Sequence, residues 1–473
     1  MFIEYFILIL NHFFIIYAIS ITSIYFVLTI ISLIEVLNYR DTKKFINYKE
    51  LLSSPFAPTI SLIAPAYNEG LSIVENIRSL LSIQYNAYEV IIVNDGSTDD
   101  SIEKMKANFS LEKVPFFVDE KIKTQKIKAI YKSTNKALHR LLVIDKENGG
   151  KADALNAGLN VSSKDLVTCI DVDCIIEPEA LLHLVMPFVA DSKKEVIACG
   201  GVIRVANDCA VQDGRLLGVR FPKSSLARFQ VLEYLRAFLL GRMAWAKING
   251  LILISGALGM FDRKIAVAAG GYNTQTVGED MELVVRMRSY MTSQKKNYKV
   301  AYIPDPLCWT EVPETHQVLG NQRNRWTRGT IEVLKLHKAM FLNRKYGVMG
   351  LISYPFWFLF EWLAPIIEAL GVIYFLILVV AGQVFWSSAL TLILVAYTLS
   401  IFFSLCALLA EELSFAKYEK KSDLWKMFIT AMLEPILYHP KTVYWSLKGN
   451  YDLLMGKKSW GKMVRTGFKK TQS

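Results

Sequence analysis

Cysteine and histidine are scarce in this chain, and their spacing excludes two kinds of stabilising site. The 473 residues include six cysteines and six histidines. No two cysteines form a C-x-x-C pair, and none has histidine partners at zinc-ligand spacing. The sequence therefore indicates neither a structural zinc site nor a disulfide framework. We expect reduced cysteines that pack as small apolar groups.

Lysine and arginine are missing from the first 39 residues, which helps to distinguish a membrane anchor from a cleaved signal peptide. A cleaved signal peptide starts with basic residues and has a short apolar region. Here the apolar segment from about Phe13 to Leu37 is long enough to cross a hydrocarbon core of ~30 Å as one helix. We therefore predict a membrane anchor over residues 1–40, followed by a linker over 41–57. Basic residues come directly after the apolar segment, which places the N-terminus outside and the next domain in the cytosol; they are Arg40, Lys43, Lys44 and Lys49.

The remaining apolar and basic residues are unevenly distributed. Hydrophobic residues make up 52% of the chain, too many for an ordinary soluble protein, yet 21% are charged. Two further apolar runs, Leu351 to Ala381 and Ala389 to Ala410, are each long enough for a span. Lysine and arginine outnumber aspartate and glutamate by 54 to 43 and gather beside apolar segments, so lipid headgroups are a better partner than nucleic acid.

The segment 427–447 is apolar but interrupted. It contains two prolines and three ionisable residues, too many for a clear span. We favour an amphipathic segment in the plane of the membrane, with a third C-terminal span as the alternative. Residues 338–447 thus form a C-terminal membrane and interfacial region, and 448–473 a basic cytosolic tail.

Residues 58–337 read as a cytosolic α/β domain, in which β-branched runs alternate with helical, charged stretches. Ligands bind at the carboxyl ends of strands in such sheets, so the residues after each run are candidate site residues. The lysine-rich stretch from Lys104 to Lys136 is expected to form helices and loops on the solvated edge. The predicted strands are Ile60–Ala64, Val90–Asn94, Leu141–Asp145 and Leu166–Asp171.

Two of these runs end in polar turns that suit a nucleotide. Tyr67 can stack on a base, and Glu69 and Asp95 can accept hydrogen bonds from ribose hydroxyls or a base N–H. Each residue also fits ordinary turn chemistry. Further along, a glycine pair precedes Lys151 at a helix start, where a lysine can meet phosphate or a sugar hydroxyl, although a glycine cap and a surface lysine are the simpler alternative. The spacing is not that of a P-loop.

Acidic residues follow the fourth predicted strand in a D-x-D pattern. In an extended chain, residues two apart point the same way, so Asp171 and Asp173 are expected to face one site. Their hard oxygen ligands suit Mg²⁺ or Mn²⁺ bridging a diphosphate. The pattern alone is weak evidence, and its position at a strand end strengthens it.

Two later motifs offer a general base and a binding surface for an acceptor. Asp280 precedes a helical stretch from Met281 and can act as general base, with Glu279 orienting it, although acidic residues at a helix start are common. Arg325 suits a pyrophosphate and Trp326 offers a flat face to a sugar ring, whereas an interfacial tryptophan with snorkelling arginine is the alternative.

In this order, the motifs resemble those of the processive family-2 glycosyltransferases, the synthases of poly-N-acetylglucosamine, hyaluronan, cellulose and chito-oligosaccharides. The resemblance covers about Pro58 to Gly329 and the membrane layout, and its most specific element is Gln322-x-x-Arg325-Trp326. It implies a GT-A-like, Rossmann-like α/β fold with transmembrane and interfacial helices, and an inverting hexosyl transfer from a UDP-sugar.

The resemblance also implies roles for individual residues. Asp280 would be the base, and Asp171 and Asp173 the metal ligands. The stretch Phe229 to Trp245 would be an interfacial helix. The remaining assignments are UDP contacts from Tyr67, Glu69, Asp95 and Lys151, diphosphate and acceptor contacts from Gln322, Arg325 and Trp326, and an acceptor-side loop containing Ser255 and Gly256.

Some features depart from the family pattern and narrow the comparison. Gly278 stands where the family usually has threonine before Glu-Asp. No cyclic-dinucleotide-binding module is evident after the spans, which argues against cellulose, and the few spans make poly-N-acetylglucosamine synthases the closer comparison.

We therefore expect a multi-pass plasma-membrane enzyme, with a UDP-sugar donor of the UDP-N-acetylglucosamine type and a growing β-linked polysaccharide as acceptor. The layout leaves room for a small membrane or export partner. A non-processive transferase acting on a lipid acceptor is the alternative. A catalytically dead partner in an export complex would require damaged motifs, and none is damaged.

Overall fold

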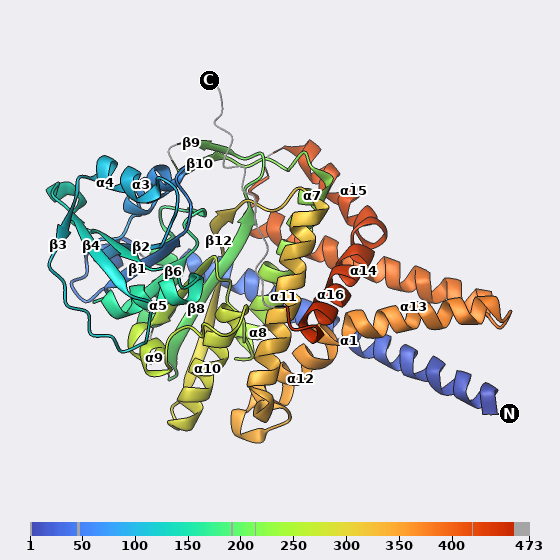
Figure 1. Ribbon diagram of the computed structural model, residues 1–473. Coiled ribbons are helices and arrows are strands. Elements are labelled where there is room, and N and C mark those ends of the chain that lie inside the picture. The colour runs from blue at the N-terminus through green and yellow to red at the C-terminus, as the bar shows by residue number, and fades with distance from the viewer. Residues whose placement is uncertain (1, 45–47, 191–192, 213, 419, 458–473) are drawn as a thin grey trace.

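A computed structural model describes residues 2–44, 48–190, 193–212, 214–418 and 420–457 (Figure 1). A mixed sheet and its helices form one end of the molecule. Three long helices, α1, α13 and α14, project together from the other end (Figure 1).

The sheet is built around four parallel strands. Strands β5, β2, β1 and β6 are neighbours in this order, with helical crossovers between β1 and β2 and between β5 and β6. These are the four strands predicted from sequence, and their near-continuous burial explains their apolar composition. The ten strands run in the order β3-β4-β5-β2-β1-β6-β11-β8-β12-β7. Their bounds are β1 Ile60–Ala66, β2 Tyr88–Asp95, β3 Leu111–Val114, β4 Ile127–Ser133, β5 Leu141–Lys146, β6 Leu166–Ile170, β7 Ile175–Ile176, β8 Glu195–Val205, β11 Leu258–Asp262 and β12 Tyr298–Thr310; β9 Ala210–Gln212 and β10 Arg215–Gly218 form a separate hairpin.

The prediction for Lys104 to Lys136 was wrong in part, because this stretch contains β3, the edge strand, and β4 beside it, both antiparallel. Only a short part of β4 is buried, at Ala129 and Ile130, while Lys128 and Lys132 are exposed. A strand that is largely open to solvent on its faces needs few apolar residues, so β4 carries only this short buried segment.

Helices cover the sheet and carry site residues at their ends. Helix α5 (Lys151–Val161) packs against β1 and β2, and its residues from Ala152 to Asn160 are buried. A Cβ at Gly158 would lie 2.3 Å from Ile63, so this close contact requires glycine. The other helices of the domain are α3 Ile73–Leu81, α4 Ser101–Phe109, α6 Ala180–Val189, α9 Arg263–Ala268, α10 Glu279–Ser293 and α11 His316–Leu336; α2 (Tyr48–Ser53) follows α1.

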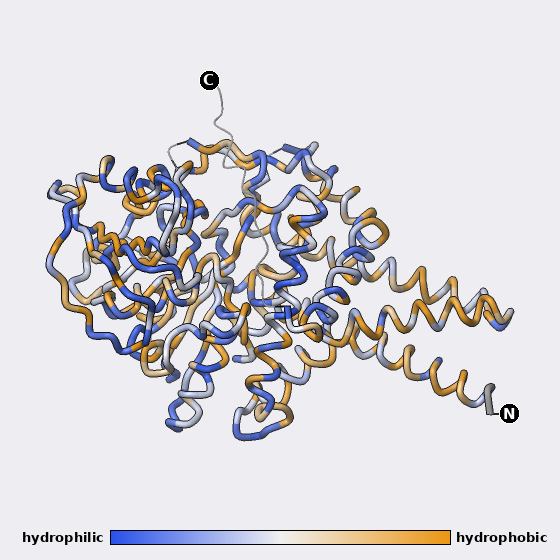
Figure 2. Tube along the Cα trace, viewed as in Figure 1, coloured by the Kyte–Doolittle hydropathy of each residue, from blue (hydrophilic) through white to orange (hydrophobic). Residues whose placement is uncertain are grey.

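Among the described residues, two helices are long and apolar enough to cross a membrane, α1 (Phe2–Lys43) and α14 (Trp386–Ser414). A bent pair, Met349–Trp362 and Ala364–Val380, would make a third span if it acts as one, with a bend of 41°. Its second half is α13 (Ala364–Val380). The projecting helices are largely apolar along their length (Figure 2). The predicted C-terminal runs thus coincide with the bent pair and with α14.

The interrupted segment 427–447 falls on two shorter helices, α15 (Lys421–Leu437) and α16 (His439–Leu454), which break at Tyr438. Neither is among the helices that meet the length and composition needed to cross a membrane. Their in-plane orientation stays a prediction. The predicted basic tail overlaps the end of α16, and its residues 458–473 lie outside the described residues.

The stretch Phe229 to Trp245 is helical throughout. Helix α7 (Ser225–Tyr234) continues through a π-helical segment, Leu235–Gly241, into α8 (Arg242–Lys247). The segment and α8 pack against α1, and the segment also packs against α14. This helix therefore joins the sheet domain to the two helices that are long and apolar enough to cross a membrane.

Two buried polar contacts fix the projecting helices α1 and α14 to the sheet. Asp305 of β12 accepts hydrogen bonds from Tyr39 and Lys43 at the end of α1 and lies 3.2 Å from His183 Nδ1. Burial alone would raise the pKa of Asp305, but His183, Lys43 and Tyr39 outweigh it and lower that pKa to about 2. Arg204 of β8 forms an ion pair with Glu411 of α14.

Candidate active site

One large cavity, of about 2100 Å³, begins at the carboxyl ends of β1, β2 and β6 and reaches the membrane helices. Every site residue predicted from sequence lines it. They are Tyr67, Glu69, Asp95, Lys151, Asp171, Asp173, Ser255, Gly256, Glu279, Asp280, Gln322, Arg325 and Trp326.

Two of the three predicted nucleotide-binding residues, Tyr67 after β1 and Asp95 at the end of β2, differ in accessibility. Half of the Tyr67 surface is exposed, so its ring is available for stacking. Asp95 is buried, and both of its carboxylate oxygens accept hydrogen bonds within the protein. Its contact with a nucleotide stays a prediction.

Asp95 organises the glycine pair that precedes α5. Its carboxylate accepts the N–H groups of Gly149 at 3.0 Å and Gly150 at 2.8 Å. Gly150 has a φ of +87°, a conformation that favours glycine. Lys146, which is fully buried, lies 2.6 Å from both Asp95 and Asp153 and offsets one of the two negative charges. The sequence analysis missed Lys146 and Asp153, because a buried lysine carries no local signal.

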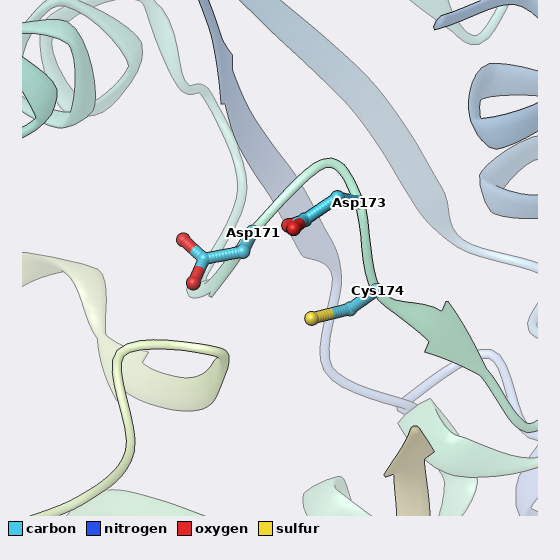
Figure 3. A group of neighbouring side chains, drawn as sticks. All are labelled: Asp171, Asp173 and Cys174. Atoms are coloured by element: carbon cyan, nitrogen blue, oxygen red, sulfur yellow. The ribbon is translucent and has the colours of Figure 1, made fainter. Parts of the chain in front are cut away.

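The D-x-D residues converge, although not for the reason expected. Strand β6 ends at Ile170, and residues 171–174 form a turn in which the Cys174 N–H donates to the Asp171 carbonyl at 3.0 Å. The turn, not an extended chain, directs both carboxylates and the Cys174 thiol to one side (Figure 3). One ligand atom from each of the three lies within 4.8 Å of the others. Two hard oxygen ligands at this spacing fit a divalent cation.

Lys151 reaches this turn from the start of α5. Its Nζ forms an ion pair with Asp171 and lies 3.5 Å from the carbonyl oxygen of Gly256. Burial disfavours its charge, but the carboxylates of Asp171, Glu279 and Asp280 outweigh burial and raise the pKa of Lys151. The ammonium group therefore stays charged beside three acids.

Glu279 and Asp280 occupy the first turn of α10, which favours negative charge. Asp280 accepts the Gly256 N–H through Oδ2 at 3.0 Å and the Met281 N–H through Oδ1 at 2.8 Å. These bonds orient its carboxylate beside the cavity. Glu279 is buried, and burial raises its pKa to about 7, with Lys151 opposing the shift and Asp280 adding to it.

A backbone contact between α10 and α11 explains the glycine at position 278. A Cβ at Gly278 would lie 2.9 Å from the carbonyl oxygen of Gly329, and one at Gly329 would lie 2.9 Å from the Gly278 Cα. Neither backbone can yield as a flexible side chain would. The two glycines let the helix carrying Asp280 approach the helix carrying Trp326.

The motif on α11 presents an aromatic face and an amide to the cavity. Trp326 is 40% exposed, and the Arg323 guanidinium stacks on its ring at 4.1 Å. Arg323 also donates to Glu233 of α7 at 2.8 Å, which fixes the stack. The Gln322 Oε1 atom is buried without a hydrogen-bond partner in the described part of the chain, so it can accept a hydrogen bond from a ligand.

Comparison with known families identifies the fold and the class. A family model described as "Glycosyltransferase like family 2" matches residues 57–329, more than half of the chain. The chain belongs to this family. A second model, described as "Chitin synthase", matches residues 271–465.

Relatives of this family-2 glycosyltransferase include poly-beta-1,6-N-acetyl-D-glucosamine synthases. The one from Staphylococcus aureus is 27% identical over 300 residues, covering 62% of this chain and 60% of the relative. The one from Staphylococcus epidermidis is 27% identical over 278 residues, covering 58% and 55%. The chain thus spans less than two thirds of the length of these relatives.

A solved structure shares the GT-A-like fold of this family-2 glycosyltransferase. It is the mannosyltransferase PcManGT from Pyrobaculum calidifontis in complex with GDP-Man and Mn²⁺. The TM-score is 0.51 at 17% identity, covering 88% of this chain and 99% of the other.

The family-2 glycosyltransferase site extends past the residues that its motifs reveal. Toward the membrane helices, Glu361 accepts a hydrogen bond from Tyr25 at 2.9 Å and lines the cavity. Glu434 of α15, also at the cavity, pairs with Arg236 at 2.9 Å. The sequence predicts that Glu361 and Glu368, seven residues apart in an apolar run, face protein or a wet path. Both contact side chains of the protein, Glu361 that of Tyr25 and Glu368 that of His439. No motif indicated Arg236 or Glu434. The aromatic residues of the same part of the cavity are Trp245, Phe356, Trp357, Trp362 and Phe403.

Proposed function

We propose that this chain is a membrane-bound inverting glycosyltransferase that moves a sugar from a UDP-sugar, of the UDP-N-acetylglucosamine type, to a growing β-linked polysaccharide. The observation that carries the proposal is the cavity. It is lined at one end by the D-x-D turn, Asp280 and Trp326, and it continues to the membrane helices. A soluble or monosaccharide acceptor would not need this continuation.

The donor would lie over the carboxyl ends of the strands. Tyr67 would stack on the base, and Lys151 would contact the diphosphate or the donor sugar. Asp171 and Asp173 would hold Mg²⁺ or Mn²⁺, which when bound offsets the charge of the departing diphosphate. Arg325 would add a second positive charge at the leaving group.

The acceptor would stack on Trp326 with its terminal hydroxyl near Asp280. Asp280 would take the hydroxyl proton while the oxygen forms a bond to the anomeric carbon of the donor. The bond from that carbon to the diphosphate would break, and UDP would leave with the electron pair. One direct displacement inverts the anomeric configuration and yields a β-linkage from an α-linked donor. Gln322, Ser255 and Gly256 would contact the acceptor.

We propose a plasma-membrane location with the catalytic domain in the cytosol, because the basic residues Arg40, Lys43 and Lys44 follow the first apolar helix. Of the described helices that line the membrane-directed part of the cavity, only α1, α14 and the bent pair containing α13 are long and apolar enough to cross a membrane. A small membrane or export partner would complete its wall.

The test is sugar transfer by purified full-length protein in lipid nanodiscs with Mn²⁺ or Mg²⁺. A panel of UDP-sugars, with GDP-mannose as the alternative donor, would be supplied and the products sized. We expect UDP release and polymer from one UDP-sugar. Products extended by only one sugar would favour a lipid acceptor instead.

Two variants sharpen this test against a matched control. Asp173→Asn should abolish metal-dependent UDP release, and Asp280→Asn should keep UDP binding while turnover falls by roughly 10²–10⁴-fold. Asp119→Asn makes the same chemical change at an exposed site and should match wild type. Full turnover in the presence of a chelator would refute the metal role, and normal turnover by Asp280→Asn would refute the base.

A further inference from the structure

Lys151 lies between the predicted metal ligands and the predicted base. Its ammonium group forms an ion pair with Asp171 Oδ1 and lies 3.5 Å from the carbonyl oxygen of Gly256. The N–H of the same glycine donates to Asp280 at 3.0 Å. One lysine thus connects the D-x-D turn, the acceptor-side loop and the first turn of α10.

The space around this lysine is strongly acidic. Asp171, Glu279 and Asp280 all act on the Lys151 charge. The Lys151 side chain is 21% exposed and that of Asp171 is 31% exposed, so water screens the pair only in part. A Cβ at Gly256 would lie 3.3 Å from the Lys151 Nζ and 3.2 Å from Asp280 Oδ2, so the glycine leaves room for the lysine there.

A metal ion on Asp171 would compete with Lys151 for the same carboxylate. An ammonium group and a divalent cation repel each other strongly at the few ångströms that separate two partners of one carboxylate. The flexible lysine stem can move its charge, whereas the metal ligands are fixed by the turn. The second partner of Lys151, the Gly256 carbonyl, already lies toward the base.

We propose that Lys151 is a built-in counter-cation of Asp171 that the metal ion displaces, so that metal binding releases the lysine toward the donor and the base. The inference rests on the metal role in the proposed function and extends it to the order of events. Lys151 is then a positioning residue that keeps the acidic cluster compact before metal and donor arrive, and it lowers metal affinity until they do.

The test measures Mn²⁺ binding and not turnover. Free Mn²⁺ would be followed by electron paramagnetic resonance during titration of the full-length protein in nanodiscs, without nucleotide. Lys151→Met removes the competing charge and should bind Mn²⁺ about 10-fold or more tightly than wild type. Lys151→Gln should also bind Mn²⁺ more tightly than wild type. Lys151→Arg keeps the charge and should bind Mn²⁺ with wild-type affinity.

Lys128→Met provides the matched control, because Lys128 is exposed on strand β4 and does not line the cavity. It should leave Mn²⁺ affinity unchanged. Asp171→Asn should lose Mn²⁺ binding with or without Lys151→Met. A damaged fold would weaken Mn²⁺ binding, so tighter binding is a result that a purely structural role cannot give.

The outcomes separate this inference from the proposed function. Wild type could bind Mn²⁺ while Lys151→Met and Lys151→Gln both bind it equally or more weakly. This result would overturn the displacement of Lys151 but would still support the metal site. No Mn²⁺ binding by wild type or by either variant, even with UDP, would overturn the metal role and the displacement together.

Discussion

Replacing Arg204 with methionine tests how the sheet holds membrane helix α14. Arg204 and Glu411 are each 2% exposed, and their ion pair joins β8 to the end of this helix. The Nε and Nη1 atoms of Arg204 and the Oε1 atom of Glu411 are buried without hydrogen-bond partners among the described residues. The pair is therefore only partly satisfied.

The expected loss of stability follows from the buried charge that each single substitution leaves without a partner. Arg204→Met should lower the free energy of unfolding by roughly 3–5 kcal/mol, because Glu411 would remain buried without compensation. Glu411→Leu should lower the free energy of unfolding by a similar amount, because the charge of Arg204 would then remain buried without its partner. The double variant should be as stable as wild type or more stable by about 1–4 kcal/mol, since it removes both charges and their unsatisfied atoms.

Thermal unfolding of the protein in detergent, followed by circular dichroism, measures these differences. Lys296→Met is the control, because its pair with Glu195 spans 3.8 Å, is exposed, and should contribute at most about 1 kcal/mol. A double variant whose cost equals the sum of the two single costs would show that the side chains act independently, and the reasoning would then be wrong.

Three further predictions concern the site. Trp326→Ala should shorten the product on sizing gels, through loss of stacking worth on the order of 1 kcal/mol or more; unchanged length and rate would remove the main support for a processive enzyme. The pKa of Glu279 is about 7 in the fold and 4.5 ordinarily, so the folded state holds a proton that the unfolded chain has lost. Its favourable contribution is complete below about pH 4.5 and is lost as pH rises through about 7. Between about pH 5 and about pH 8 the free energy of unfolding should therefore fall by roughly 2–3 kcal/mol, and Glu279→Gln should remove this fall. An equal pH dependence in both proteins would contradict this origin. Gly278→Ala should cost about 1–3 kcal/mol by overpacking against Gly329 and should lower turnover. Gly218→Ala, whose Cβ would have 3.9 Å of room, should be neutral, and equal effects of the two changes would refute the contact.

The sequence predicted the centre of the sheet well because burial on both faces leaves a local signal. Strands β1 and β2 are apolar along almost their whole length and end in polar turns. Strand β4, next to the edge strand β3, was missed because Lys128 and Lys132 are exposed and only Ala129 and Ile130 are buried. Periodicity therefore identified the strands that bear the site and failed where the sheet meets solvent.

The motifs predicted residues that the fold brings to one cavity, and their roles there stay predictions, whereas their mutual contacts were not predicted. Lys151 and Asp171 are separated by a helix and a strand, and only the packing of α5 on β1 brings them together. The Asp95 and Lys146 pair has the same origin, since β2 and β5 become neighbours only in the folded sheet. Contacts of this kind depend on topology, which a single sequence specifies only weakly.

The close approach of Gly278 and Gly329 also limits which sequences lie one substitution away from this one. A threonine at 278, usual in the synthases that the motifs resemble, would bring its Cβ to 2.9 Å from the Gly329 carbonyl oxygen and could be accepted only after α10 and α11 had separated. That separation would pull the carboxylate of Asp280 away from the ring of Trp326. Exchange between the glycine and threonine forms of this motif should therefore require compensating changes along the α10–α11 interface, and a library that varies position 278 alone should return glycine.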